Sequence, residues 1–185
     1  MIPSTSLAGH SFGSRTAPEI VDLADQNGSI LIVPVGSVEQ HGDHLPVATD
    51  TVLVCDVLTA SLDRLEDVPV LATPPVWFGY SPHHLSFGGT LSAEFDTLRS
   101  LLYEIATTGL GNDFDTVVFL NGHGGNMALV ETVVSDVGLD HPDAEVLGLT
   151  YFELAAGFID EIRESELGGM AHGGEFETSL MMHLH

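Results

Sequence analysis

The sequence predicts an α/β protein with a mainly parallel central sheet, flanked by helices on both faces in three layers. Two observations indicate this fold: continuous apolar runs alternate along the chain with segments of helical periodicity, and no repeat or low-complexity segment interrupts the alternation. A third observation indicates the number of domains, because 185 residues with 44% hydrophobic content suffice for one sizeable core. We therefore expect a single domain over residues 1–185.

The first half of the chain contains two predicted strands and two predicted helices. Residues 16–25 are expected to form a short helix with Thr16 as its cap. Residues 29–35 are a continuous apolar run, which is typical of a buried parallel strand. Residues 50–65 carry apolar side chains at helical spacing, and residues 68–72 form the next predicted strand.

The second half of the chain continues the alternation. A helix is expected over residues 92–107, with Ser92 as its cap and with Gly109 and Gly111 ending it. The following elements keep the order: a strand over residues 116–121, a helix beginning near Met127, a strand over residues 146–150, and a partly helical remainder from Glu153. In parallel sheets of this kind, active sites lie at the carboxyl ends of the strands.

The charge balance excludes two classes of partner. Four Arg and no Lys stand against 27 acidic residues, for a formal net charge of −23. So few bases cannot form a track for nucleic acid, and an acidic membrane surface would repel the chain. No apolar run approaches the ~20 residues of a membrane span, and no signal peptide pattern is present. The single Cys55 fits a reducing cytoplasm.

The excess of acid also predicts adaptation to salt. Self-repulsion on this scale disfavours the compact state in dilute buffer, whereas concentrated salt screens it. We expect a protein from a high-salt cytoplasm, such as that of a halophilic archaeon. An ordinary acidic protein is the alternative, which the complete lack of Lys makes weaker.

The first polar cluster follows the apolar run of residues 29–35 and combines carboxylates with imidazoles. It extends from Glu39 through His41 to Asp50. Glu39 and His41 are two residues apart, so in an extended segment both side chains point the same way. Carboxylate and imidazole together suit zinc, manganese or iron(II). A polar surface loop with Asp50 as a helix cap is the alternative.

Two further clusters place histidine beside glycines. Three glycines accompany His123 in the segment 121–126 and permit a tight turn. A phosphate-binding loop is a competing interpretation, but the segment matches neither nucleotide-loop pattern and the chain has no Lys. His172 is followed by Glu175 and Glu177, for which a solvated loop is the alternative. Together the three clusters could hold two metal ions that share a carboxylate and activate a water molecule.

These motifs resemble those of the creatininase (creatinine amidohydrolase) family. The resemblance rests on residues 34–50, 121–126 and 172–179, which occur in the family's order, and on Phe87-Gly-Gly-Thr90 near its F-P-G-T motif. It covers most of the chain. It implies a compact α/β fold with a parallel sheet, a dinuclear metal site, and a homo-oligomer, often a hexamer.

The resemblance also implies a role for each motif residue. Glu39 and His123 would bind one metal ion, His41 would bind the other, and Asp50 would bridge both. His172 would be the catalytic proton carrier. The two divalent ions would be zinc, with manganese or iron(II) as alternatives.

The chain departs from the family pattern at the second metal ion. Creatininase has a ligating Glu two residues after the motif His, where this chain has Gly125. Glu175 is the expected substitute, as in members that read H-A-G-E, and Glu177 is expected to orient a ligand. His83 and His84 lie near the F-G-G-T segment and are expected either to contact substrate or to be exposed. The family also continues further past E-T-S, so the domain is expected to be short at its C-terminus.

The leading functional hypothesis is metal-dependent hydrolysis of a C–N bond in a linear or cyclic non-peptide amide. Creatininase places Trp around its substrate, whereas the single Trp77 lies outside the corresponding segments, so creatinine itself is not expected. A metallopeptidase acting on a short peptide in cofactor maturation is the first alternative. A truncated, inactive metal-binding scaffold is the second.

Overall fold

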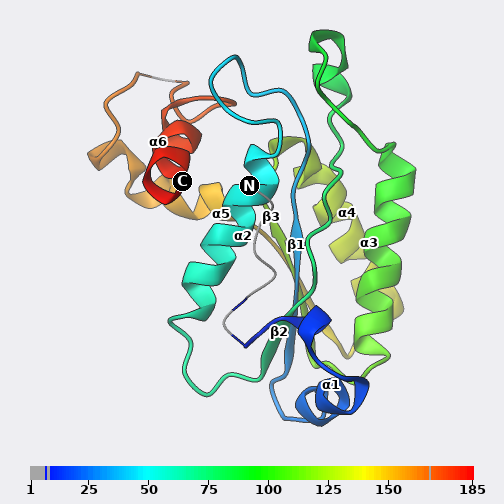
Figure 1. The fold of residues 1–185 in the computed structure, drawn as a ribbon. Coiled ribbons are helices and arrows are strands. Elements are labelled where there is room, and N and C mark those ends of the chain that lie inside the picture. Colours follow the sequence, from blue (N-terminus) through cyan, green and yellow to red (C-terminus); the bar gives the residue numbers. More distant parts are fainter. Residues whose placement is uncertain (1–6, 8, 167) are drawn as a thin grey trace.

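A four-stranded parallel sheet forms the centre of the protein (Figure 1). The computed structural model describes residue 7, residues 9–166 and residues 168–185. The strand order is β2-β1-β3-β4. These strands are β1 Ile30–Val35, β2 Val70–Ala72, β3 Thr116–Asn121 and β4 Glu145–Thr150. The predicted α/β fold with a mainly parallel central sheet is confirmed.

Six α-helices and five short 3-10 helices are present in the described part of the chain. The α-helices are α1 Ala17–Ala24, α2 Thr49–Leu62, α3 Phe95–Leu110, α4 Met127–Asp140, α5 Tyr151–Leu154 and α6 Glu175–Leu184. The 3-10 helices are η1 Phe12–Ser14, η2 Pro82–Phe87, η3 Gly124–Asn126, η4 Ala155–Gly157 and η5 Ile159–Glu161. No helix in residues 7, 9–166 and 168–185 combines the length and apolarity needed to cross a membrane.

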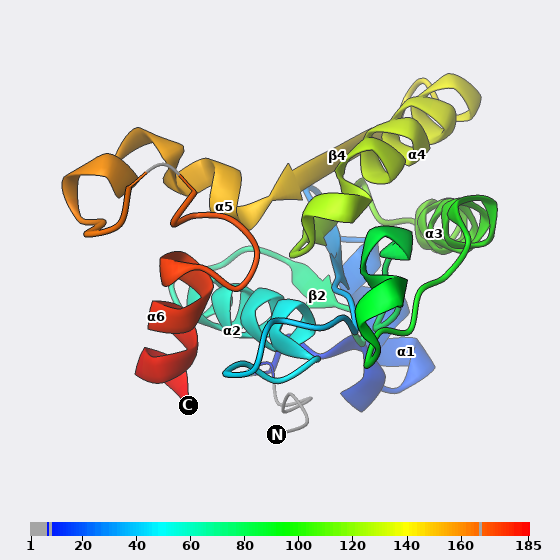
Figure 2. The ribbon, with the colours of Figure 1, turned by 90° about the horizontal axis from the view of Figure 1, so that it is seen from above.

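Helices cover both faces of the sheet, as Figure 2 shows: α3 and α4 lie on one side, and α2 with α6 lies on the other. Alternation along β1 explains this arrangement, because Leu31, Val33 and Val35 face the core under α3 and α4. Ile30 and Ile32 pack on the opposite side against the core under α2. The central strands are therefore apolar on both faces, which the continuous apolar runs indicate.

Register aligns the strand ends that carry the polar clusters. Val35 at the end of β1 pairs with Asn121 at the end of β3, which in turn pairs with Thr150 of β4. The segments after β1 and β3 therefore begin side by side at one edge of the sheet. Figure 1 shows that η2 projects beyond the same edge.

The beginning and end of α3 differ from the sequence prediction. Ser92 does not cap this helix, which begins at Phe95 after Glu94. The Ser92 hydroxyl instead accepts a hydrogen bond from the backbone N–H of Ser81, at 2.8 Å. Gly109 lies inside the helix, where an added Cβ would stand 2.6 Å from a methyl carbon of Leu31 and would force that side chain to shift.

Candidate metal centre

The candidate site is built at the carboxyl ends of β1 and β3. The chain leaves β1 in an extended segment, turns at Gly42 with a φ of +68°, and returns so that the Glu39 N–H donates to the Val47 carbonyl at 2.8 Å. This loop carries Asp50, in the first turn of α2, back to Glu39 and His41.

Four charged or titratable side chains are buried together in this site. The exposed fractions of Glu39, His41, Asp50 and His123 are 1%, 0%, 2% and 4%. Burying ionised groups is costly unless each finds an opposite charge or a metal ion. The cluster therefore needs internal compensation.

Asp50 stands between the two buried imidazoles. Its Oδ1 lies 3.1 Å from His41 Nε2, and its Oδ2 lies 3.1 Å from His123 Nδ1. His123 Nδ1 also lies 3.2 Å from Glu39 Oε1. One carboxylate thus faces two separate nitrogen atoms with its two oxygens, which is the arrangement of a bridging ligand.

Backbone carbonyl groups fix which nitrogen of each ring carries hydrogen. His41 Nδ1 lies 3.0 Å from the Glu39 carbonyl oxygen, and His123 Nε2 lies 3.2 Å from the Tyr80 carbonyl oxygen. A carbonyl oxygen only accepts, so each of these nitrogens is the donor. In the neutral rings, the opposite nitrogens present lone pairs to the carboxylates. Imidazoles oriented in this way are typical of metal ligands.

Two carboxylate oxygens of the site lack hydrogen bonds among the described residues. Glu39 Oε2 and Asp50 Oδ2 are buried without a hydrogen bond in the described part of the chain, although His123 Nδ1 lies 3.1 Å from Asp50 Oδ2. Ligands held about 2.0–2.2 Å from one tetrahedral zinc ion lie about 3.3–3.6 Å apart, a little more than the 3.1–3.2 Å separations at His123. A divalent cation would satisfy the free oxygens and the imidazole lone pairs together, so these residues fit a metal.

Protons compete for the same nitrogens. Burial lowers the pKa of His41, but Asp50 and Glu177 beside the ring raise it more, to about 10. Burial likewise lowers the pKa of His123, and Asp50 with Glu39 raises it to about 10. Burial raises the pKa values of Glu39 and Asp50, yet the adjacent imidazoles hold both below their ordinary values. The cluster is therefore stabilised either by imidazolium groups or by cations in their place.

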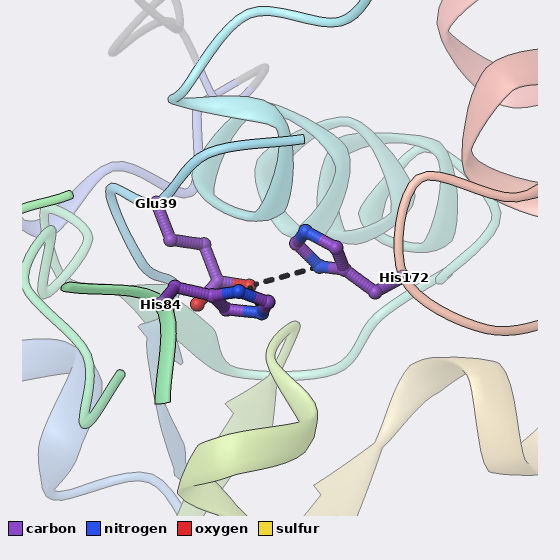
Figure 3. A group of neighbouring side chains, drawn as sticks. All are labelled: Glu39, His84 and His172. Atoms are coloured by element: carbon purple, nitrogen blue, oxygen red, sulfur yellow. Dashed lines mark ion pairs between the residues drawn. The ribbon is translucent and has the colours of Figure 1, made fainter. Parts of the chain in front are cut away.

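His172 reaches the site from the segment before α6. Its Nδ1 lies 3.2 Å from Glu39 Oε1, the contact drawn in Figure 3. The side chain is 30% exposed, so it connects the buried cluster to solvent. Its ring stacks on His84, with ring centroids 4.1 Å apart, and His84 Nε2 lies 3.9 Å from the same Glu39 oxygen. His83 is exposed and lies parallel to His123 at 5.9 Å.

The two glutamates of α6 have different surroundings. Glu177 Oε1 lies 3.6 Å from His41 Nε2, and its Oε2 accepts the Gly173 N–H at 2.6 Å. Glu175 turns away: its two oxygens accept the backbone N–H groups of Glu164 and Ser165, at 2.8 and 2.6 Å. The structure therefore brings Glu177 to the cluster and does not bring Glu175, the reverse of the preference drawn from the sequence.

Several groups of side chains could each supply three metal ligands. His41 belongs to two of them, one with Glu39 and Asp50 and another with His172 and Glu177. Glu39 forms two more groups: with His83 and His123, and with His84 and His172. All eight candidates other than Glu175 thus converge on one place.

Sequence reasoning missed two residues that orient the candidates. Gln40 places its side-chain nitrogen 2.9 Å from His84 Nδ1 and 3.1 Å from His172 Nε2. The buried Ser81 hydroxyl lies 3.1 Å from His123 Nε2 and 2.7 Å from that of Ser37. The position of Gln40 between Glu39 and His41 was an available signal, whereas Ser81 had none.

Comparison with known proteins gives the same family over nearly the whole chain. The family described as "Creatininase: Creatinine amidohydrolase" matches residues 14–185. A mycofactocin precursor peptide peptidase of Mycobacterium ulcerans (strain Agy99) is 35% identical over 183 residues, covering 92% of this chain and 67% of that protein. A creatinine amidohydrolase of Pseudomonas putida is 31% identical over 172 residues, covering 84% of this chain and 64% of that one.

A solved structure described as "Creatininase Mn" has the same architecture. Its TM-score is 0.85 at 27% identity, covering 95% of this chain and 73% of that chain. The chain thus spans about two thirds of the length of these relatives. The shared fold and the match over residues 14–185 lead to one conclusion: the chain belongs to the creatininase family.

Proposed function

We propose that this chain is a metal-dependent hydrolase that cleaves an amide C–N bond. One observation carries the proposal: the two buried imidazoles, His41 and His123, are fixed by backbone carbonyls so that their free nitrogens face the carboxylates of Asp50 and Glu39. Such a donor set suits zinc and manganese equally. The relative described as "Creatininase Mn" supports the second of these ions.

The residues divide into two overlapping ligand sets. Glu39, His123 and Asp50 Oδ2 would hold one ion, and His41, Asp50 Oδ1 and Glu177 would hold the other. We assign the last ligand to Glu177 rather than to Glu175, because both oxygens of Glu175 are occupied by backbone N–H groups. Ions held there would polarise an amide carbonyl group and lower the pKa of a water molecule.

His172 is the proposed proton carrier. Its ring lies beside Glu39 and is 30% exposed, so it can take a proton from water at its unprotonated nitrogen and return it to a leaving nitrogen. Glu39 Oε1 orients the ring through Nδ1, at 3.2 Å. His84 stacks on His172 and is the residue proposed to contact a bound substrate.

A short peptide is the second candidate substrate beside a small amide. The mycofactocin precursor peptide peptidase of M. ulcerans supports it, because its name gives a peptide as substrate. Two exposed apolar side chains form a rim beside His84 on η2: Leu85 and Phe87 are 54% and 72% exposed. Such a rim can bind apolar side chains of a peptide. A small cyclic amide would leave this rim unused.

The test measures bound metal and hydrolysis together. The protein loaded with Zn²⁺ or Mn²⁺ is assayed against creatinine, small formamides and short peptides. The variant Glu39→Gln is assayed in the same way. Glu131→Gln, on the exposed side of α4, is the matched control. We expect metal retention and amide hydrolysis in the parent and the control, and loss of both in Glu39→Gln. His172→Ala is expected to keep its metal and lose turnover. A parent that binds metal but hydrolyses nothing would indicate an inactive scaffold.

We further propose that the acidic surface adapts the protein to a high-salt cytoplasm. At molar salt, screening acts within about 3 Å, so repulsion among exposed carboxylates nearly vanishes. The thermal unfolding midpoint is expected to rise from dilute buffer to molar KCl. Sedimentation in the same buffers tests for the expected homo-oligomer. A midpoint independent of salt would contradict the adaptation.

A further inference from the structure

Gln40 connects the two solvent-side imidazoles of the site. Its side-chain nitrogen lies 2.9 Å from His84 Nδ1 and 3.1 Å from His172 Nε2. These three residues come from the segment after β1, from η2 and from the segment before α6. One amide group thus joins three parts of the chain that are far apart in sequence.

The orientation of this amide follows from a third contact. Gln40 Oε1 accepts the backbone N–H of Gly42 at 2.9 Å. That N–H can only donate, so the amide oxygen must face it and the NH₂ group must face the two rings. The backbone N–H of Gln40 is also fixed, at 3.1 Å from the Thr90 hydroxyl. The amide therefore cannot exchange its ends without losing a hydrogen bond.

An amide NH₂ group has two hydrogens and no acceptor. The nitrogens it meets, His84 Nδ1 and His172 Nε2, must therefore be unprotonated acceptors. The ring hydrogens are then on His84 Nε2 and His172 Nδ1. Both of these atoms face Glu39 Oε1, at 3.9 and 3.2 Å (Figure 3). Gln40 and Glu39 thus contact opposite nitrogens of the same pair of rings.

We propose that Gln40 is a positioning residue that sets the tautomer and orientation of His172 and His84 through its two amide hydrogens. The role rests on the proposed function of this site, in which the hydrogen of His172 faces the metal ligands. A ring with the opposite tautomer would direct its hydrogen toward Gln40, away from the cluster. The amide therefore keeps the Nδ1–H of His172 directed at Glu39 and leaves Nε2 as the ring nitrogen that can take up and return a proton.

The test replaces Gln40 and reads the ring tautomers directly. Gln40→Met keeps the length of the side chain and removes both hydrogens, and Gln40→Glu replaces donors by acceptors. The exposed Gln26, whose side-chain nitrogen donates to the Asp22 carbonyl at 3.1 Å, offers the matched control Gln26→Met. Long-range ¹H–¹⁵N spectra of histidine-labelled, metal-free protein report the hydrogen position in each ring, assigned with His84 and His172 variants.

We expect a single Nδ1–H form of His172 in the parent and in Gln26→Met, a mixture in Gln40→Met, and hydrogen at Nε2 in Gln40→Glu. With a substrate of the proposed reaction, kcat should fall about 10- to 100-fold in Gln40→Met while KM and metal content change little. An unchanged tautomer and an unchanged kcat in Gln40→Met would overturn the assignment. A tautomer shift in a protein without hydrolytic activity would uphold the positioning role and refute the proposed function instead.

Discussion

The site has two halves that are built differently. In the half formed by the ends of β1 and β3, Glu39, His41, Asp50 and His123 are at most 4% exposed, and both imidazoles are fixed by backbone carbonyl groups. In the half formed by the segment before α6, His172 is 30% exposed and is positioned by side chains. The strand ends and the start of α2 therefore place four of the five candidate metal ligands, whereas the segment before α6 supplies the proton carrier. Changes in the buried half should affect metal binding, and changes at His172 should affect turnover.

The largest expected effect on metal content comes from Asp50→Asn in the buried half of the site. Its two oxygens face two different imidazoles, so removing the charge should lower metal content at both positions rather than one. Elemental analysis after equilibrium dialysis measures this loss. Asp43→Asn, exposed in the same loop, is the control and should retain full metal. Loss of a single ion in Asp50→Asn would show that Asp50 does not bridge.

The second prediction concerns pH. His41 and His123 have pKa values raised to about 10, so in metal-free protein their ion pairs are fully present below the ordinary value of 6.5 and are lost as pH rises through about 10. Stability of the metal-free protein should therefore fall over this range. Binding of each ion displaces one of these protons, so the affinity for each ion should rise roughly tenfold per pH unit below about 10.

Thermal unfolding and metal titrations between pH 6 and pH 9 check both trends. Proton release on metal binding, measured with a pH indicator, should approach two per chain near pH 8. Release of no protons would contradict the assignment of these two nitrogens as ligands.

A smaller effect is expected from Ser81→Ala. The hydroxyl lies 3.1 Å from His123 Nε2, while the Tyr80 carbonyl at 3.2 Å still holds the same ring nitrogen. Metal affinity should therefore fall by about tenfold, the lower end of the range for residues that orient a ligand. Ser86→Ala, exposed on η2, is the control. A fall in kcat without a change in metal affinity would break the division between the two halves.

Much of the fold could be predicted from the sequence because it depends on short-range patterns. Strand β3 has the predicted bounds, and α1 forms with the expected cap at Thr16, since each depends on apolar runs or on a local capping box. The helix expected over residues 50–65 ends at Leu62. The true start of α3 was missed because Ser92 is drawn into a contact with Ser81, 11 residues away.

Convergence of the candidate ligands was also predictable, because parallel strands end at one edge of the sheet. The distinction between Glu175 and Glu177 was not. It depends on the backbone N–H groups of Glu164 and Ser165, which occupy Glu175 through contacts that no local pattern encodes. The role of Gln40 depends likewise on rings supplied by two distant segments.

The most direct test of the account compares metal stoichiometry in Glu177→Gln and Glu175→Gln after dialysis against Zn²⁺. The account predicts two ions per chain in the parent and in Glu175→Gln, and one in Glu177→Gln, because Glu177 lies 3.6 Å from His41 whereas Glu175 holds the loop backbone. Two ions in Glu177→Gln together with one in Glu175→Gln would contradict the assignment of the second ligand set.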